Sequence, residues 1–289
     1  MPELPDLDIL ADASHTALVG RHVTGTDVAQ SIVMRGTASE LAALEGQRLT
    51  SVRRRGKFLA FQLDRDRIVC NLMLTGRLGF AAPAAKAFPQ TAVVFSFGNR
   101  SDPPTGSAAW TRGAPWRPSD DAPVEMRIRD ATRMGKVYVV PQGVIRPVAG
   151  WDELGPDADD LALTIDTWRE RIRPHRGELK NLLKDQAFVA GIGNGYSDEI
   201  LWEARLAPFR KRSTLAADEV DALYLALRSV PKWAITELRK RVPPRFEVEV
   251  RDFLRVHRKG GTPCPRCGTT ISEISPGGFV TSWCRTCQR

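Results

Sequence analysis

The feature that most constrains this chain is a Cys-x₂-Cys-x₁₆-Cys-x₂-Cys pattern at its C-terminus. Two residues between paired cysteines allow a tight turn to present both sulfur atoms to one ion, and four thiolates satisfy tetrahedral Zn²⁺. The spacing therefore favours one zinc ion in a small β-ribbon over two disulfides. Four protein ligands leave no open position, so the ion is expected to be structural. The expected ligands are Cys264, Cys267, Cys284 and Cys287.

The remaining cysteine, Cys70, lies in the apolar run Ile68–Leu72 and is expected to be a buried core thiol. Such cysteine usage suits a reducing compartment. The chain has no apolar stretch long enough to span a bilayer, and the acidic, proline-rich start Met1–Asp6 does not resemble a signal peptide. We therefore expect a cytoplasmic protein with no membrane partner.

The chain is basic. Lys and Arg total 42 against 34 Asp and Glu, which gives a net charge of +8. This balance favours a polyanionic partner such as nucleic acid, although charge alone is equally compatible with a basic surface that has no specific partner. The basic residues around the ribbon leave the same choice open between nucleic-acid contact and a mere stabilising clip.

The N-terminal half predicts a helix followed by antiparallel strands. The helix is expected over 5–19, and the strands over 48–63 with a turn at Gly56, 68–74, 91–97, 124–128 and 134–141. The segment 98–123 is rich in Pro, Gly, Ser and Asp, and it predicts a long exposed loop that carries Trp110, Arg112, Trp116 and Arg117. Antiparallel strands with short turns favour a β-sandwich.

The second half predicts helices. Leu161, Ile165, Trp168 and Ile172 recur at helical spacing, and further helices are expected over 178–185, 194–204 and 215–230. The glycine-rich turn 189–196 precedes the helix expected over 194–204, where free amides at a helix start suit a phosphate. The predicted class is α+β, with domains at 1–145 (two-sheet sandwich with an N-terminal helix), 150–245 (helical) and 246–289 (ribbon).

The N-terminus itself offers chemistry. Removal of Met1 would expose the secondary amine of Pro2, and a free α-amino group has a pKa near ~7.7–8.0, so a useful fraction is unprotonated at neutral pH. Such an amine can attack a sugar C1′ and form an iminium, and Glu3 is placed to donate a proton. Taken alone, Pro2 and Glu3 are better explained as an ordinary N-terminus near a helix start.

Four motifs in order resemble one family, the formamidopyrimidine-DNA glycosylase/endonuclease VIII group of helix–two-turn–helix DNA glycosylases. The resemblance spans nearly the whole chain. It is carried by Met1–Pro5, Arg55-Gly56-Lys57, the turn 185–194 and the four cysteines.

The resemblance implies roles for particular residues. Pro2 would be the nucleophile that forms a Schiff base, Glu3 the acid that protonates the sugar ring oxygen, and Lys57 the lysine that holds the phosphate beside the lesion. Arg133, Lys180, Gly193 and Asn194 match positions that grip phosphates. The implied activity is removal of a damaged, flipped-out base from double-stranded DNA, followed by β,δ-elimination at the abasic site, with no organic cofactor and a monomeric enzyme.

The chain also departs from the family. Asp6 stands where a glutamate is usual. Leu74, Thr132 and Met134 occupy the positions that fill the gap left by the flipped base, usually Met, Arg and Phe. Leu and Met can act as apolar wedges, whereas Thr132 cannot imitate an arginine that reads the opposite base. These three positions are also compatible with core or loop filling. Phe279 replaces an arginine of the finger and is expected either to weaken backbone binding or to stack.

Lesion choice is the least constrained. The segment 240–246 looks too short for the loop that caps flipped 8-oxoguanine, which argues against that lesion as the main substrate. Two alternatives remain: a non-catalytic DNA-binding protein on the same scaffold, and a zinc-ribbon protein of ribosomes or transcription. The last explains the cysteines and the charge but neither the N-terminus nor the glycine turn.

Overall fold

The computed structural model describes residues 1–100 and 115–289, which form two compact units. The sandwich unit comprises Met1–Asp152 and Leu238–Glu249, and the helix–ribbon unit comprises Glu153–Glu237 and Val250–Arg289. The division into three domains remains a prediction. Among the described residues, no helix has the length and apolar character needed to cross a membrane.

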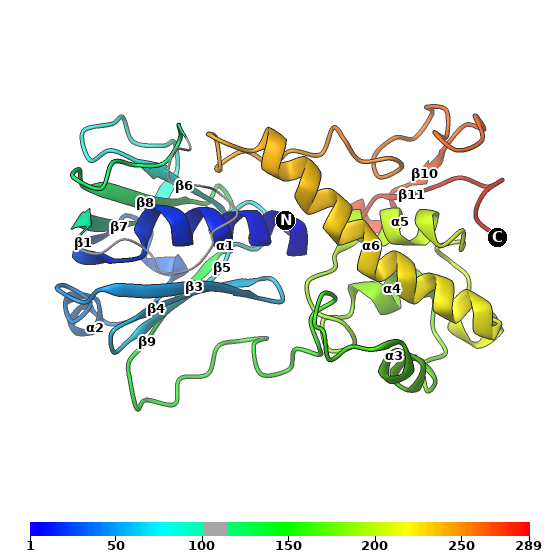
Figure 1. Ribbon diagram of the computed structural model, residues 1–289, viewed down its shortest axis with the longest axis horizontal. Helices are drawn as coiled ribbons and strands as arrows, with labels where there is room; N and C mark the ends of the chain where they lie inside the picture. Colours follow the sequence, from blue (N-terminus) through cyan, green and yellow to red (C-terminus); the bar gives the residue numbers. More distant parts are fainter. Residues whose placement is uncertain (101–114) are drawn as a thin grey trace. The chain divides into compact units, whose positions relative to one another are not determined.

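The sandwich unit has two sheets, with strand orders β1-β7-β8-β6 and β2-β9-β5-β4-β3. Figure 1 draws them as separate layers. Pairing is antiparallel except between β2 and β9. The strands are β1 (Arg21–Val28), β2 (Met34–Arg35), β3 (Leu49–Arg55), β4 (Phe58–Leu63), β5 (Arg67–Asn71), β6 (Arg77–Ala81), β7 (Thr91–Arg100), β8 (Val124–Arg129) and β9 (Lys136–Val140).

Alternation of apolar residues explains how these strands form the core. In β7, Val93, Phe95 and Phe97 are fully buried at every second position, as one face of a strand requires. In β4, Leu59 and Phe61 are buried in the same way, and the Cys70 thiol of β5 is confirmed as a core group. Burial raises the pKa of the Cys70 thiol to about 12, so it stays protonated.

Helix α1 (Leu4–Leu18) is buried along most of its length and packs on β3. Arg21, just after it, is also fully buried. Its guanidinium donates hydrogen bonds to the carbonyl oxygens of Ala17, Gly98, Ser119 and Ala122 at 2.6–2.9 Å. Arg21 therefore fastens both ends of the segment between β7 and β8 to the end of α1.

The structure adds strands β1, β2 and β6 and helix α2 to the N-terminal prediction. Strands β1 and β6 were not predicted, because β1 carries mostly polar residues and β6 is short and contains Gly79. Helix α2 (Ala38–Ala42) was also missed. Of the predicted loop 98–123, residues 101–114, with Trp110 and Arg112, lie outside the described part. Trp116 makes an edge contact with Phe246 at 4.7 Å, and Arg117 pairs with Asp120.

The helix–ribbon unit contains α3 (Ile165–Ile172), α4 (Leu179–Lys184) and α5 (Asn194–Glu203), and most of α6 (Ala217–Arg241). Two short strands, β10 (Ser272–Ile274) and β11 (Thr281–Trp283), form the antiparallel ribbon. The α+β class, with a sandwich, a helical region and a ribbon, is therefore confirmed.

Two helix predictions are wrong in detail. Leu161 is 87 % exposed and precedes α3, and Leu163 is buried in its place. Helix α6 continues past the predicted end at 230, through Pro231, to Arg241. Between the end of α6 and the first zinc-site cysteine, Cys264, the chain covers residues 242–263. That 8-oxoguanine is not the main substrate remains a prediction.

Candidate functional site

Pro2 and Glu3 lie at the start of α1. Glu3 is the N-cap residue; its backbone N–H donates to Asp6 Oδ2 at 2.8 Å, and its carbonyl accepts from the Leu7 N–H at 3.0 Å. Pro2 is buried and the Glu3 side chain is 4 % exposed. The Met1 amino group lies 3.7 Å from Glu249. The amine and the carboxyl are thus consecutive, and the capping contacts fix the backbone that carries them.

Lys57 follows the turn of the β3–β4 hairpin, where Gly56 has a positive φ of 54°. Its side chain is 9 % exposed. On β3, Arg54 Nε lies 3.7 Å from Asp8 Oδ1 of α1, and this ion pair fastens the hairpin to the first half of the helix. The fold therefore brings the hairpin that carries Lys57 to the helix that carries Glu3.

The two expected wedge residues are exposed. Leu74 is 52 % and Met134 44 % exposed, which excludes core filling at these two positions. Thr132 and Arg133 are exposed beside Met134. The roles of all four in DNA binding remain predictions.

The glycine turn precedes α5, as predicted. Gln186 closes it: its side chain accepts from the Gly191 N–H at 3.0 Å and donates to the Ile192 carbonyl at 2.7 Å. Gly191 has a φ of 96°, which favours glycine. Gly193 is the N-cap of α5, and no acidic residue lies in the first turn of that helix. This helix start thus keeps the partial positive charge that suits an anion.

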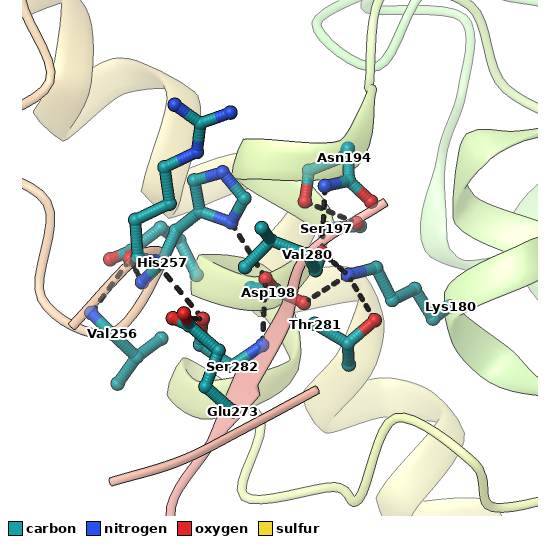
Figure 2. A network of polar contacts seen from close by, with 12 residues as sticks. Lys180, Asn194, Ser197, Asp198, Val256, His257, Glu273, Val280, Thr281 and Ser282 are labelled. Atoms are coloured by element: carbon teal, nitrogen blue, oxygen red, sulfur yellow. Dashed lines mark hydrogen bonds and ion pairs between the residues drawn. The ribbon is translucent and has the colours of Figure 1, made fainter. Parts of the chain in front are cut away.

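Lys180 lies in a buried network of polar contacts. Lys180 is 4 % exposed, and its ammonium donates to Asp198 Oδ1 (2.6 Å), the Val280 carbonyl (2.8 Å) and Thr281 Oγ1 (2.8 Å). Asn194 Nδ2 donates to the same Val280 carbonyl at 2.7 Å (Figure 2). An ammonium has three donors, and all three point at protein acceptors here. These three contacts hold the ribbon to α4 and α5, and the phosphate contact of Lys180 remains a prediction.

Three buried polar residues in this network were missed. Asp198 also accepts from the Ser282 N–H at 3.1 Å and lies 2.7 Å from His257 Nδ1. Glu199 accepts hydrogen bonds from the backbone N–H groups of Arg255, Val256 and His257. Burial raises the pKa of Glu199 despite these bonds. In the sequence, the only trace of this burial is a run of polar residues inside an otherwise apolar helix.

The four ribbon cysteines form the metal site. Their sulfur atoms lie within 4.8 Å of one another, as ligands of a single ion must. Four soft thiolates at tetrahedral spacing fit Zn²⁺, which is structural here because every position is filled by the protein. The Trp202 Nε1–H donates to Cys264 Sγ at 3.4 Å, and Trp202 packs with both Cys264 and Cys284 in the ribbon core.

Phe279 lies in the turn between β10 and β11 and is 63 % exposed. The Lys184 ammonium lies 5.6 Å from the centre of its ring. An exposed ring paired with a cation is suited to stacking, but whether it contacts DNA remains a prediction.

Comparison with known proteins agrees with this architecture. The formamidopyrimidine-DNA glycosylase N-terminal domain profile matches residues 1–105, the formamidopyrimidine-DNA glycosylase H2TH domain profile matches 154–242, and a zinc finger found in FPG and IleRS matches 261–289. The structure of MutM (Fpg) from Thermus thermophilus superposes with a TM-score of 0.77 at 26 % identity, covering 99 % of this chain and 98 % of that one. The Lactococcus lactis Fpg in complex with abasic-site DNA gives 0.82 at 22 % identity, covering 99 % of each chain, and shows the shared fold.

Sequence relatives are similar over their whole length. A formamidopyrimidine-DNA glycosylase of Thermomicrobium roseum is 32 % identical over 100 % of this chain and 99 % of its own. Another, from Pelotomaculum thermopropionicum, is 29 % identical over the same shares. This full-length identity, together with the sandwich, the helices and the Cys₄ ribbon, shows that the chain belongs to the formamidopyrimidine-DNA glycosylase family.

Proposed function

We propose that this protein is a base-excision-repair DNA glycosylase that also cleaves the strand at the resulting abasic site. The consecutive placement of Pro2 and Glu3 at the capped start of α1 carries the proposal. Membership of the family supports it, as does the likeness to a Lactococcus lactis Fpg that binds abasic-site DNA.

In the proposed reaction, the unprotonated Pro2 nitrogen attacks C1′ of the damaged nucleotide. The bond from C1′ to the base breaks, the base leaves with the bonding electrons, and Glu3 protonates the ring oxygen as the sugar opens to an iminium. Loss of a proton from C2′ then expels the 3′ phosphate, and a second elimination expels the 5′ phosphate. Lys57 would hold the phosphate beside the lesion. The reaction requires Met1 to be absent.

Lesion choice belongs to the proposal as well. We propose that 8-oxoguanine is not the main substrate, and the comparison of lesions in the trapping assay tests this. Damaged double-stranded DNA is the proposed partner in every case.

The test is borohydride trapping on a panel of duplexes that carry 8-oxoguanine, a formamidopyrimidine, thymine glycol, dihydrouracil or an abasic site. Mass spectrometry first confirms that the protein begins at Pro2. We expect a trapped complex on the abasic site and on at least one lesion, and proteolysis should locate the DNA adduct on the peptide that begins with Pro2.

Two variants sharpen this test. Glu3→Gln keeps the side-chain size and should lower base excision by about 10²–10⁴-fold, whereas binding to a stable abasic-site analogue should persist. Pro2→Gly should sharply reduce the trapped complex. An adduct on a lysine would refute the assigned nucleophile. Binding of damaged duplex without any trapping would instead support a non-catalytic damage-binding protein.

A further inference from the structure

Two neighbouring turns of the sandwich unit cross from one sheet to the other. One joins β5 to β6, and the other joins β8 to β9. Asn71 pairs with Lys136 in one sheet, and Arg77 pairs with Arg129 in the other. These two pairings place the turns 72–76 and 130–135 side by side at the same edge of the sandwich.

Each turn presents one exposed apolar side chain, Leu74 on the first and Met134 on the second. Each is directly preceded by a residue in the left-handed region: Met73 has a φ of 49° and Arg133 a φ of 58°. Non-glycine residues rarely adopt this conformation, and such strain gathers at binding sites, where surrounding contacts must maintain it.

The hydrogen bonds that hold the two turns in this conformation converge on Asp130, which is 2 % exposed. One carboxylate oxygen accepts from the Gly135 N–H at 2.6 Å, and the other accepts from Thr75 Oγ1 and from the Thr132 N–H at 3.2 Å. Thr75 Oγ1 and Thr132 Oγ1 also lie 2.6 Å apart. We name Thr75, Asp130, Thr132 and Gly135 the clasp, because their hydrogen bonds join the two turns.

The clasp is built for an ionised carboxylate. Burial acts to raise the pKa of Asp130, but the hydrogen bonds from Thr75, Gly135 and Thr132 outweigh it and hold the pKa below the usual value. A Cβ at Gly135 would lie 3.0 Å from Asp130 Oδ2, so the turn fits closely around the carboxylate. Asp130 therefore stays charged at neutral pH and accepts hydrogen bonds only.

We propose that the clasp makes Leu74 and Met134 one rigid two-part wedge, in which Thr132 positions the turns and does not read the base opposite the lesion. This inference depends on the proposed function. The Thr132 hydroxyl already bonds Thr75 and Asp130, so its side chain is committed to the clasp. A rigid wedge enters the base stack without first having to order two loops, and it therefore lowers the cost of displacing the damaged base.

The test compares two rates for each variant: excision of a lesion, which requires base displacement, and cleavage at a ready-made abasic site. Asp130→Asn and Thr132→Val remove clasp bonds with little change in size. We expect the ratio of excision to cleavage to fall about tenfold or more, because a misplaced wedge impairs displacement most. Thr50→Val is the matched control, since its hydroxyl bonds only the Gln62 carbonyl among the contacts shown and lies on a different strand pair.

Lesion duplexes with each of the four opposite bases give a second readout. A purely positioning role predicts that Thr132→Val lowers excision by the same factor opposite all four. A loss confined to one opposite base would show that Thr132 reads that base and would overturn the inference, as would an unchanged ratio. If Asp130→Asn melts below the assay temperature by circular dichroism, Thr75→Val together with Thr132→Val provides the test.

The two proposals fail differently. A wild-type protein that neither excises lesions nor cleaves abasic sites would overturn the proposed function and the wedge with it. An active wild-type protein whose clasp variants match the Thr50→Val control in the ratio would overturn the wedge alone.

Discussion

Trp202 supports the zinc site through a polar contact as well as by packing. Its indole N–H points at the Cys264 sulfur, and the Arg266 guanidinium stacks 3.9 Å from its ring centre while donating to the Trp202 carbonyl at 2.8 Å. A hydrogen bond to a ligating thiolate disperses its charge and fixes its orientation, and groups of this kind tune metal retention.

Replacing Trp202 by Phe should therefore accelerate zinc loss. The ring that packs in the ribbon core is kept while the N–H is lost, so we expect release to a chromogenic chelator to be about tenfold faster. Trp168→Phe is the control, because it also loses a buried indole hydrogen bond, to the Val220 carbonyl, and Trp168 is not part of the ribbon core that contains Cys264 and Cys284. Equal release rates in both variants would show that the N–H does not matter to the metal.

At the level of single residues, the sequence predicts what a side chain can do chemically better than it predicts which groups that side chain contacts in the fold. Cysteine spacing identified the metal site, whereas the sequence left Leu74 and Met134 open between wedges and core or loop filling, and the structure shows both exposed. The phosphate contact assigned to Lys180 remains a prediction, but the sequence did not show the protein acceptors that its ammonium contacts. Those acceptors, Asp198 and the Val280 carbonyl, are 18 and 100 residues away in the chain. Only the folded ribbon brings them together.

At the level of elements, Asp198 joins α4, α5 and the ribbon in one buried network (Figure 2). Neutralising a buried carboxylate leaves its cationic partner without compensation, and this is the costly way to break an ion pair. The network thus makes the two helices and β11 depend on one another.

Asp198→Asn should lower the free energy of unfolding by about 3–5 kcal/mol, because the Lys180 ammonium would stay buried without a counter-charge. Denaturant unfolding of the zinc-loaded protein measures this change in the free energy of unfolding. Asp221→Asn is the matched control: Asp221 pairs with Arg169 at the surface, where solvent screens the charges, and little change is expected. Similar losses in both variants would mean that the buried network adds no stability of its own.

Elements were predicted well where periodicity is strong and poorly where tertiary contacts decide. The β3–β4 hairpin and the start of α5 follow from turn glycines and alternating apolar residues. The continuation of α6 through Pro231 could not be predicted from the sequence pattern. Packing of Ala234 and Leu238, both fully buried, compensates for the backbone hydrogen bond that proline cannot make. Strand β1 is held by its neighbours β7 and β3 rather than by its own composition.

At the level of the whole molecule, the net charge of +8 predicts salt-dependent binding to DNA, because each cation that neutralises a phosphate releases a counterion. Net charge alone does not say which cations are used. Arg133 is the sharpest candidate, since it is exposed between Thr132 and Met134 in a turn that the clasp holds in the left-handed conformation.

Arg133→Ala should therefore reduce the slope of log affinity against log salt concentration by about one unit for a duplex with a stable abasic-site analogue, as the loss of one phosphate contact requires. Arg169→Ala makes the same change in net charge at an exposed arginine that pairs with Asp166 and Asp221. If only net charge mattered, both variants would shift the salt dependence equally. A shift confined to Arg133→Ala would instead assign one counterion to the turn beside the wedge, and would thereby locate the DNA backbone on the sandwich unit.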